Sequence, residues 1–483
     1  MTTGVLSVAS EVFPLIKTGG LADVAGALPA SLAAHDFAVR TLMPGYPDVM
    51  RQIDNADIAC RFDDLFGGPA RVLAATAGGL DLLVLDAPHL FDRTGGPYVS
   101  SAGHDHADNW ARFAALSKAG AEIGQGAIPG FAPAIVHAHD WQAALTPVYL
   151  AVSGKPRPRT VVTIHNLAFQ GNFPYQIFPR LGLPPSAWSI EGVEYYGNVG
   201  YLKGGLHAAD AVTTVSPTYA EEILTPGGGM GLDGLLRGRG ERLVGIVNGI
   251  DTEVWNPKTD PDIPHHYSAR SPKARQRNKR ALETEFGLAH EDGPIVAVVS
   301  RLTWQKGLDL VADACDDLVE RGVRMVVVGS GEPMIEGSFQ AAHTRHPNKI
   351  GVRIGYDEAL SHRVQAGADA ILVPSRFEPC GLTQLYGLRY GCIPVVAKVG
   401  GLADTVIDAN HAAITAGVAT GFIFAPPTRD DLIDAVDRMQ RLYADPAAWR
   451  QLQLSAMQSD VSWRSSAGHY AQLFRDLIGD QRP

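Results

Sequence analysis

The sequence predicts an α/β protein made of two doubly wound domains, each built on a parallel sheet. Short apolar runs rich in valine and isoleucine alternate with helical patterns along both halves of the chain. Runs of this kind, without polar alternation, are typical of parallel strands covered by helices on both faces. The chain is also 483 residues long, which is too long for one ordinary hydrophobic core. Two blocks of alternating strands and helices therefore predict two such domains.

The expected strands follow one another in two groups. They lie at 5–10, 135–139, 161–165, 211–216 and 243–248 in the first half, and at 295–300, 324–329, 370–374 and 393–398 in the second. Segment 249–273 separates the groups, because it is rich in proline, aspartate and histidine and lacks periodicity. We therefore expect a first domain at 1–250 and a second at 251–460.

Two further segments read as helices. The basic stretch KARQRNKRALETEFGL (273–288) predicts a solvated helix that opens the second domain. In the tail 461–483, apolar residues recur at helical spacing, at Trp463, Ala467, Tyr470, Leu473 and Phe474. The tail is expected to form a helix with one packed face.

Composition excludes several classes of function. The net charge of −10 argues against a general nucleic-acid binder. The sequence contains no run of 18 apolar residues, so no membrane span is expected. The N-terminus lacks the basic start of a signal peptide, so none is expected there. The four cysteines show no C-x-x-C spacing and read as reduced thiols of a cytoplasmic protein; they are Cys60, Cys315, Cys380 and Cys392.

One phrase, K-x-G-G-L-A-D, occurs twice, at 17–23 and at 398–404. Each copy follows an expected strand and precedes a helix. The glycines allow a sharp turn and close approach of the backbone, and the amides of a helix N-terminus favour an anion. With a lysine beside them, the two turns are expected to cradle phosphate from opposite sides of a cleft. The alternative is that both are merely tight strand-to-helix turns.

Polar side chains gather where the expected strands end. In open parallel sheets, ligands bind beyond the carboxyl ends of the strands. The residues found at these ends are His139, Asp140, His165, Asn166, Asn248, Arg301, Lys306 and Glu378. His137 and His139 could also share a metal on one strand face, but no Asp-x-Asp partner lies near a strand end, so a catalytic metal is not expected.

These residues lie in stretches that resemble bacterial glycogen synthases and plant starch synthases. The matching stretches are KTGGLADV, HAHDWQA, TIHNLAFQG, VNGIDTEVWNP, SRLTWQKGLDL, IGYDE, FEPCGLTQLYGLRYG and KVGGLADTV. The resemblance implies the GT-B fold, in which two Rossmann-like domains face each other across a cleft and the last helix crosses back to the N-terminal domain. It also implies transfer of glucose from ADP-glucose to the non-reducing 4-OH of an α-1,4-glucan, with retention and without a cofactor.

The resemblance further implies roles for individual residues. Those it places at the reaction are Glu378, His165, Asp140, Arg301 and Lys306. Those it places at the donor, besides Arg301 and Lys306, are Lys17, Gly20, Asn248, Tyr356, Cys380, Gly381, Leu382 and Thr383. Glu11, Tyr98 and Trp141 are expected on the acceptor side. A metal-free enzyme must neutralise the leaving diphosphate with fixed cations and amide dipoles, and Arg301 and Lys306 supply such cations. The wider superfamily often has a second glutamate eight residues after the one that Glu378 resembles. Here that position is Tyr386, so paired carboxylates are not expected.

Other hypotheses stay open at this point. The chain could be a GT-B enzyme that uses another nucleotide-sugar, or a non-catalytic protein that binds glucan or nucleotide. A dinucleotide-dependent dehydrogenase would need G-x-G-x-x-G after the first strand, and the sequence there does not supply it. Hinge closure of two domains is expected at 249–257 and before the last helix.

Overall fold

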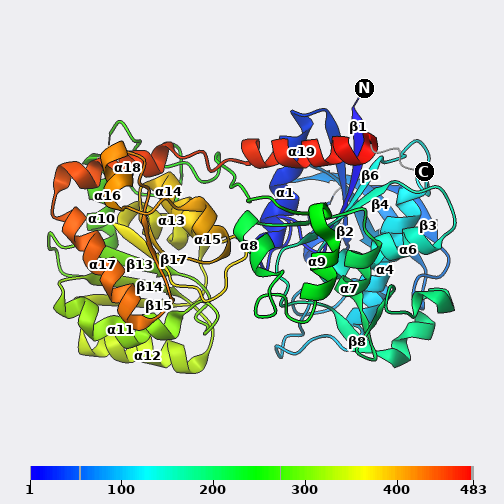
Figure 1. The fold of residues 1–483 in the computed structure, drawn as a ribbon, viewed down its shortest axis with the longest axis horizontal. Coiled ribbons are helices and arrows are strands. Elements are labelled where there is room, and N and C mark those ends of the chain that lie inside the picture. The colour runs from blue at the N-terminus through cyan, green and yellow to red at the C-terminus, as the bar shows by residue number, and fades with distance from the viewer. Residues whose placement is uncertain (1, 54–55, 272, 480–483) are drawn as a thin grey trace. The chain divides into compact units, whose positions relative to one another are not determined.

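The computed structural model describes residues 2–53, 56–271 and 273–479. They fall into two compact units (Figure 1). The first combines the described residues up to Asn248 with those from Trp463 onward, and the second is Gly249–Ser462. No helix in the described ranges has both the length and the apolar content needed to cross a membrane.

The main sheet of the first unit has nine strands in the order β12-β11-β7-β6-β1-β2-β5-β4-β3. Neighbours from β12 to β5 are parallel, and β4 pairs antiparallel with both β5 and β3. These strands are β1 (Thr3–Val8), β2 (Phe37–Pro44), β3 (Asp57–Phe62), β4 (Ala70–Ala77), β5 (Leu80–Asp86), β6 (Ile135–His139), β7 (Arg159–Ile164), β11 (Ala211–Thr214) and β12 (Leu243–Gly245). A small antiparallel sheet holds β8 (Asn172–Pro174), β10 (Asn198–Gly200) and β9 (Glu194–Tyr195).

The helices of the first unit connect these strands. They are α1 (Gly20–Ala33), α2 (Pro47–Met50), α3 (Pro88–Phe91), α4 (Asn109–Gly124), α5 (Asp140–Ala143), α6 (Leu145–Val152), α7 (Tyr201–Ala208), α8 (Pro217–Glu222), α9 (Asp233–Arg239) and α19 (Trp463–Gly479), with short 3₁₀ turns η1 (Tyr175–Arg180), η2 (Pro185–Ala187) and η3 (Gly240–Arg242).

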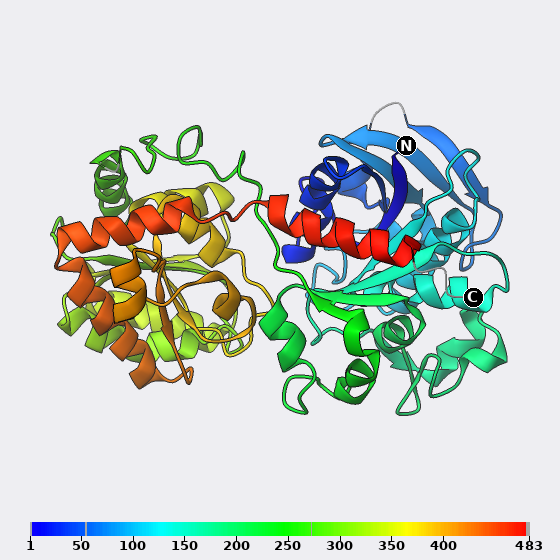
Figure 2. The ribbon, with the colours of Figure 1, turned by 45° about the horizontal axis from the view of Figure 1, so that its top comes forward.

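Helix α19 returns from the second unit to pack on the first, beside α1 (Figure 2). The predicted apolar face is the packed one. Trp463, Ala467, Tyr470 and Phe474 join one buried cluster with residues of α1, β1 and β6. The ring of Phe474 meets that of Phe37 edge to face at 5.5 Å. Burial of this face holds the tail in place.

The second unit has one parallel sheet of six strands, in the order β15-β14-β13-β16-β17-β18. Its strands are β13 (Ile295–Val299), β14 (Arg324–Gly329), β15 (Ile350–Ile354), β16 (Ala370–Val373), β17 (Ile393–Ala397) and β18 (Phe422–Phe424). Its helices are α10 (Lys273–Phe286), α11 (Leu308–Glu320), α12 (Pro333–Arg345), α13 (Glu358–Gly367), α14 (Thr383–Tyr390), α15 (Gly400–Thr405), α16 (His411–Ala416), α17 (Arg429–Tyr443) and α18 (Pro446–Gln458).

The strands of this sheet are apolar on both faces because both faces are covered. Along β13, Val296 and Val298 belong to one buried cluster, and Ile295 and Ala297 belong to another. Successive side chains of a strand point to opposite faces, so each cluster fills one side of the sheet. The absence of polar alternation, from which a parallel sheet was predicted, follows from this arrangement.

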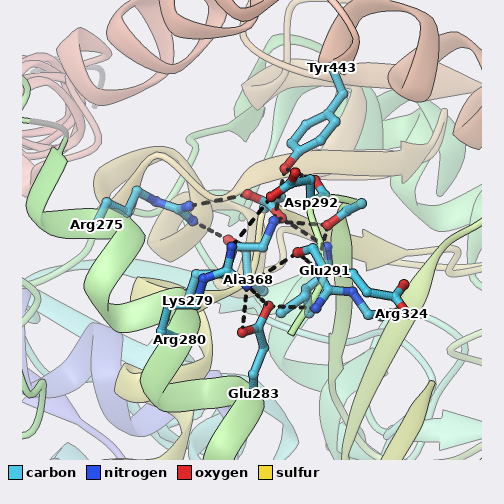
Figure 3. Close-up of polar contacts among 12 residues, drawn as sticks. Arg275, Lys279, Arg280, Glu283, Glu291, Asp292, Arg324, Ala368 and Tyr443 are labelled. Carbon is cyan, nitrogen blue, oxygen red and sulfur yellow. Dashed lines mark hydrogen bonds and ion pairs between the residues drawn. The ribbon is translucent and has the colours of Figure 1, made fainter. Parts of the chain in front are cut away.

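The prediction that the basic helix at 273–288 is solvated is wrong. Lys279 and Glu283 of α10 are buried and meet charged residues from the sheet (Figure 3). The Lys279 ammonium lies 2.7 Å from Asp369 Oδ2, and Glu283 pairs with Arg280 and with the fully buried Arg324. Arg324 opens β14 and Asp369 immediately precedes β16, so this network lies at the amino edge of the sheet.

The segment 249–257, expected as a hinge, is held within the second unit. The backbone amide of Ile250 donates to Val461. Trp255 is buried, with its ring stacked between those of His362 and Tyr386 at 3.7 and 3.6 Å. The chain passes from one unit to the other at 248–249 and at 462–463.

Candidate functional site

Each sheet has one position where the chain order reverses, and the predicted polar residues follow the strands that flank it. In the first unit, β1 lies between β2 and β6; Glu11 and Lys17 follow β1, and Asp140 follows β6. In the second, β13 lies between β14 and β16; Arg301 follows β13 and Glu378 follows β16. Such switch points are where open α/β sheets bind ligands. The two units therefore each present one candidate half-site.

Asp140 has the geometry of a functional residue in the first half-site. Its backbone is in the left-handed region, at φ +54, a conformation that costs energy for a residue other than glycine. Its Oδ1 accepts the backbone amides of His165 at 2.7 Å and Asn166 at 3.4 Å. Burial raises the pKa of this carboxyl to about 7 despite those two hydrogen bonds, and the nearby charge of Glu11 adds to the increase. The fold thus holds a strained, nearly buried carboxyl at the end of β6.

We expect Asp140→Asn to stabilise the fold at alkaline pH. A carboxyl whose folded pKa lies above its unfolded value near 4 favours folding most below that value, and the benefit is lost as the pH rises through about 7. Above that pH the Asp140 carboxyl is a buried charge, and the neutral amide of asparagine avoids the cost of burying it. This cost is on the order of a few kcal/mol, at about 1.4 kcal/mol per pKa unit. Thermal unfolding of the full chain at pH 8 and pH 4 measures this. A lower Tm than the unsubstituted chain at pH 8 would contradict the buried-charge argument.

Glu11 holds the first lysine–glycine turn. Its carboxylate accepts the Thr18 hydroxyl at 2.6 Å, the Thr18 amide, the Gly19 amide at 3.2 Å and the Tyr98 hydroxyl. Glu11 is 3% exposed and Tyr98 is half-buried, and the structure shows both in the support of this turn. The two amides that immediately precede the helix are thus occupied by this internal carboxylate. Gly20 begins α1 directly after them.

Lys17 projects from the same turn. Its ammonium donates to Asp23 at 2.9 Å and lies 5.3 Å from the centre of the Phe13 ring. The lysine side chain is one-quarter exposed. A partly exposed ion pair of this kind is weak, so the ammonium can turn to a stronger anion at little cost.

Two other predicted residues of the first unit differ in their surroundings. Asn248 is 6% exposed, and its Oδ1 has no hydrogen-bond partner within the described ranges. A buried acceptor without a partner is costly, which fits a residue that awaits a ligand. Trp141 is half-buried, edge to face with Phe113 at 5.0 Å, and Gly171 lies so close that a Cβ there would come within 2.4 Å of its ring.

In the second unit, Glu378 and Lys306 form one pair. The Lys306 ammonium lies 2.5 Å from Glu378 Oε2, which also accepts the Ser375 hydroxyl at 2.8 Å. Glu378 is 5% exposed. The sequence indicated both residues but neither their direct contact nor Ser375. An ionised, oriented carboxylate at the switch point is what this pair provides.

The loops that carry these residues are tied together. The Arg376 guanidinium holds Asp309 with two bonds of 2.6 and 2.7 Å and lies over the Trp304 ring. Gly307 has φ +68, and a Cβ there would come within 2.1 Å of the Pro374 carbonyl oxygen. Only glycine lets the loop after β13 approach the loop after β16 so closely. This approach is what brings Lys306 to Glu378.

The second copy of the repeated phrase packs on this same region. The Gly401 amide donates to the carbonyl of Glu378 at 3.2 Å. A Cβ on Gly400 would come within 2.0 Å of that carbonyl oxygen, and one on Gly401 within 2.4 Å of the Cys380 Cα. The two copies of the phrase, at 17–23 and 398–404, therefore have different structural roles. The first is folded around Glu11, and the second is a close backbone contact that supports the segment 378–380.

The remaining predicted donor residues lie at the same edge of the sheet. Arg301 is exposed, and no described residue forms an ion pair or hydrogen bond with its side chain. Tyr356 is 67% exposed, which leaves a ring face open. Cys380, Gly381 and Leu382 lead into α14, which begins at Thr383, and Gly381 has φ +75.

Among the residues that the structure describes, one group of side chains could hold a metal ion. Asp260, Asp262 and His362 could bring one ligand atom each together. Asp260 already accepts His362 Nδ1 at 2.8 Å and the Tyr390 hydroxyl, so these side chains satisfy one another. His137 and His139, considered as ligands from the sequence, instead bond Thr163 and His165.

Comparison with known proteins gives two family models, one for each half of the chain, and relatives that match nearly its whole length. The starch synthase catalytic domain family matches residues 4–238, and the family of glycosyl transferases group 1 matches residues 280–451. A glycogen synthase of Rhodopseudomonas palustris strain CGA009 is 58% identical over 99% of this chain and 100% of its own length. Glycogen synthase 1 of Rhizobium meliloti strain 1021 is 60% identical over 98% of this chain and 99% of its own.

Solved structures agree in fold. The catalytic domain of starch synthase IV from Arabidopsis thaliana, bound to ADP and acarbose, superposes with a TM-score of 0.89 at 31% identity. The match covers 99% of this chain and 100% of that one. A sucrose-phosphate synthase from Thermosynechococcus elongatus superposes with a TM-score of 0.59 at 19% identity and 99% coverage of both chains, which shows the shared fold alone.

Proposed function

This chain belongs to the family of starch synthase catalytic domains and bacterial glycogen synthases, and from that membership we propose that it transfers glucose from ADP-glucose to the non-reducing 4-OH of an α-1,4-glucan. It is a glycosyltransferase of the GT-B fold. The transfer retains the anomeric configuration and uses no metal ion or other cofactor. The observation that supports this most directly is the pair of the partly buried Lys306 and the buried Glu378 at the switch point of a nucleotide-binding type of sheet.

In this proposal the residues divide the charge that develops during transfer. Breaking the bond between glucose and diphosphate leaves negative charge on the phosphate, and Arg301 and Lys306 neutralise it together with the amides at the start of α14. Glu378 balances the positive character of the glucosyl group. Asp140 and the region of His165 lie on the glucose and acceptor side. Asn248 supplies a hydrogen bond to the sugar, and Tyr356 packs against the adenine.

Release of ADP tests the proposal. The purified chain is mixed with ADP-glucose and glycogen, and ADP is measured with and without EDTA. We expect release that depends on glycogen, is insensitive to EDTA and greatly exceeds release of UDP from UDP-glucose. Proton NMR of the new linkage should show the α-anomer. Glucan binding without ADP release would instead indicate a non-catalytic binding protein, and a strict need for Mg²⁺ would remove the metal-free mechanism.

We expect Lys17→Ala to weaken donor use. Loss of a charged hydrogen bond to a phosphate corresponds to about 1.5–3 kcal/mol, so kcat/KM for ADP-glucose should fall roughly 10-fold to 100-fold while the apparent KM for glycogen changes little. Steady-state kinetics with each substrate varied measures this. Lys155→Ala, at an exposed lysine of the same unit, is the control. Donor kinetics equal in both variants would contradict a phosphate role for Lys17.

The proposed location is the cytoplasm. All four cysteines lie in the described ranges and none forms a disulfide bond, as suits a reducing compartment. No nucleic acid or membrane partner is proposed, in keeping with the acidic net charge of −10.

A further inference from the structure

Two histidines from neighbouring strands share a hydrogen bond at the edge of the first half-site. His139 is the last residue of β6, and its register partner on β7 is Thr163. His165 follows β7 directly, so the two imidazoles come to lie side by side. His139 Nδ1 and His165 Nε2 are 3.0 Å apart, and both residues are buried.

A bond between two ring nitrogens requires one proton between them, with one nitrogen donating and the other accepting. Burial lowers the pKa of His139 to about 3 and lowers the pKa of His165 well below its ordinary value. Both rings are therefore neutral at pH 7, and each carries one proton. The pair then has two possible states, with both rings protonated on Nδ1 or both on Nε2, so the tautomer that His139 adopts determines that of His165.

The ring of His139 is itself held in place. It lies 4.1 Å from the ring of His137, centre to centre. His137 Nε2 bonds the Thr163 hydroxyl at 2.6 Å, which bonds the Thr213 hydroxyl at 2.6 Å. On the other side of the site, the His165 amide is bound by Asp140. The backbone of His165 is thus fixed by Asp140, and its side chain by His139.

We propose that His139 is a positioning residue that sets the ring orientation and the single tautomer of His165. The role of His165 beside the glucosyl group rests on the proposed function, whereas its tautomer does not. His139 contacts no substrate in this proposal and acts only through His165. Orientation of a reacting group affects the transition state, so loss of His139 should lower kcat more than it raises KM.

Two substitutions of similar polarity separate this role from packing. The amide of His139→Asn reaches the place of Nδ1 and can donate or accept, whereas the amide of His139→Gln reaches instead toward the place of Nε2. We expect kcat to fall about 10-fold to 100-fold in H139Q, with KM for ADP-glucose within about twofold, and to be largely retained in H139N. His207→Gln, at an exposed histidine near the end of α7 in the same unit, is the control and should stay within about twofold in kcat.

Nitrogen-15 NMR of the histidine-labelled full chain provides a readout independent of transfer. The His165 signals, assigned by their loss in H165Q, should show one tautomer in the unsubstituted chain, in H207Q and in H139N, and an averaged pair in H139Q. A single unchanged tautomer in H139Q, or equal kcat in H139Q and H139N, would overturn the proposal. A chain with the single tautomer but no ADP release would leave the positioning intact and remove the proposed function instead.

Discussion

Transfer by Glu378→Ala is expected to fall by about 100-fold to 1000-fold in kcat, with the fold retained. Removal of one preorganised charge from the transition state has effects of that size. Glu378 is buried against Lys306 and Ser375, so the variant also leaves the Lys306 ammonium without its partner. ADP release measures the rate, and the Tm of the full chain checks the fold.

Glu253→Ala, at an exposed glutamate of the same unit, provides the matched control and should be unaffected. In a double-mutant cycle, Glu378→Ala with Lys306→Ala should lose less than the sum of the single losses, because the two residues act as one pair. A Glu378→Ala enzyme that keeps half its rate would remove this carboxylate from the mechanism.

Arg324→Met is expected to destabilise the second unit by about 3–5 kcal/mol. Arg324 is fully buried, pairs with the buried Glu283 and donates to the carbonyls of Ala289, Glu291 and Gly293 (Figure 3). Methionine fills the volume but leaves an anion and three carbonyls without those donors. Urea unfolding, with hydrogen exchange of the β14 amides as the readout, measures the loss of stability.

The double variant Arg324→Met/Glu283→Met should recover part of this loss, since it also removes a buried carboxylate that keeps Arg280 but has lost its buried partner. The loss should also depend on pH. Burial would raise the pKa of Glu283, but the hydrogen bonds from Arg280 and Arg324 outweigh it and hold the pKa below its ordinary value. The stabilisation by a depressed carboxyl is present above the unfolded pKa and is lost as the pH falls through the folded one. A loss that stays the same down to pH 3 would contradict the ion-pair explanation.

The architecture could be predicted because it depends on patterns that are local in sequence. Runs such as 295–300 are apolar throughout, because the strand that they form is covered on both faces. Polar residues such as Asp140 and Arg301 mark where strands end. The GT-B fold and the glycogen synthase resemblance are confirmed by the comparisons. The apolar spacing of 463–474 likewise matches the face that is buried.

The partners of buried polar groups could not be predicted, because they come from distant parts of the chain. From the sequence, the charged residues of α10 were expected to face solvent. In the structure, Arg324 at the start of β14 and Asp369 just before β16 pack against them. Glu11 folds the 17–20 turn with a carboxylate that the repeated phrase does not contain. The bond from His139 to His165 requires the register of β6 on β7, which sequence alone leaves open. The roles assigned to individual site residues stay predictions.

The place of α19 has a consequence for how the chain is made. Because this last helix completes the core of the first unit, the whole of Gly249–Ser462 is inserted between two parts of one folding unit. During synthesis the part of the first unit that precedes Gly249 must wait for α19, with the surface of Val24, Leu28 and Phe37 uncovered until then. A chain that ends at residue 462 would expose the apolar surface that α19 otherwise covers. It would be prone to aggregate even if its second unit folded correctly.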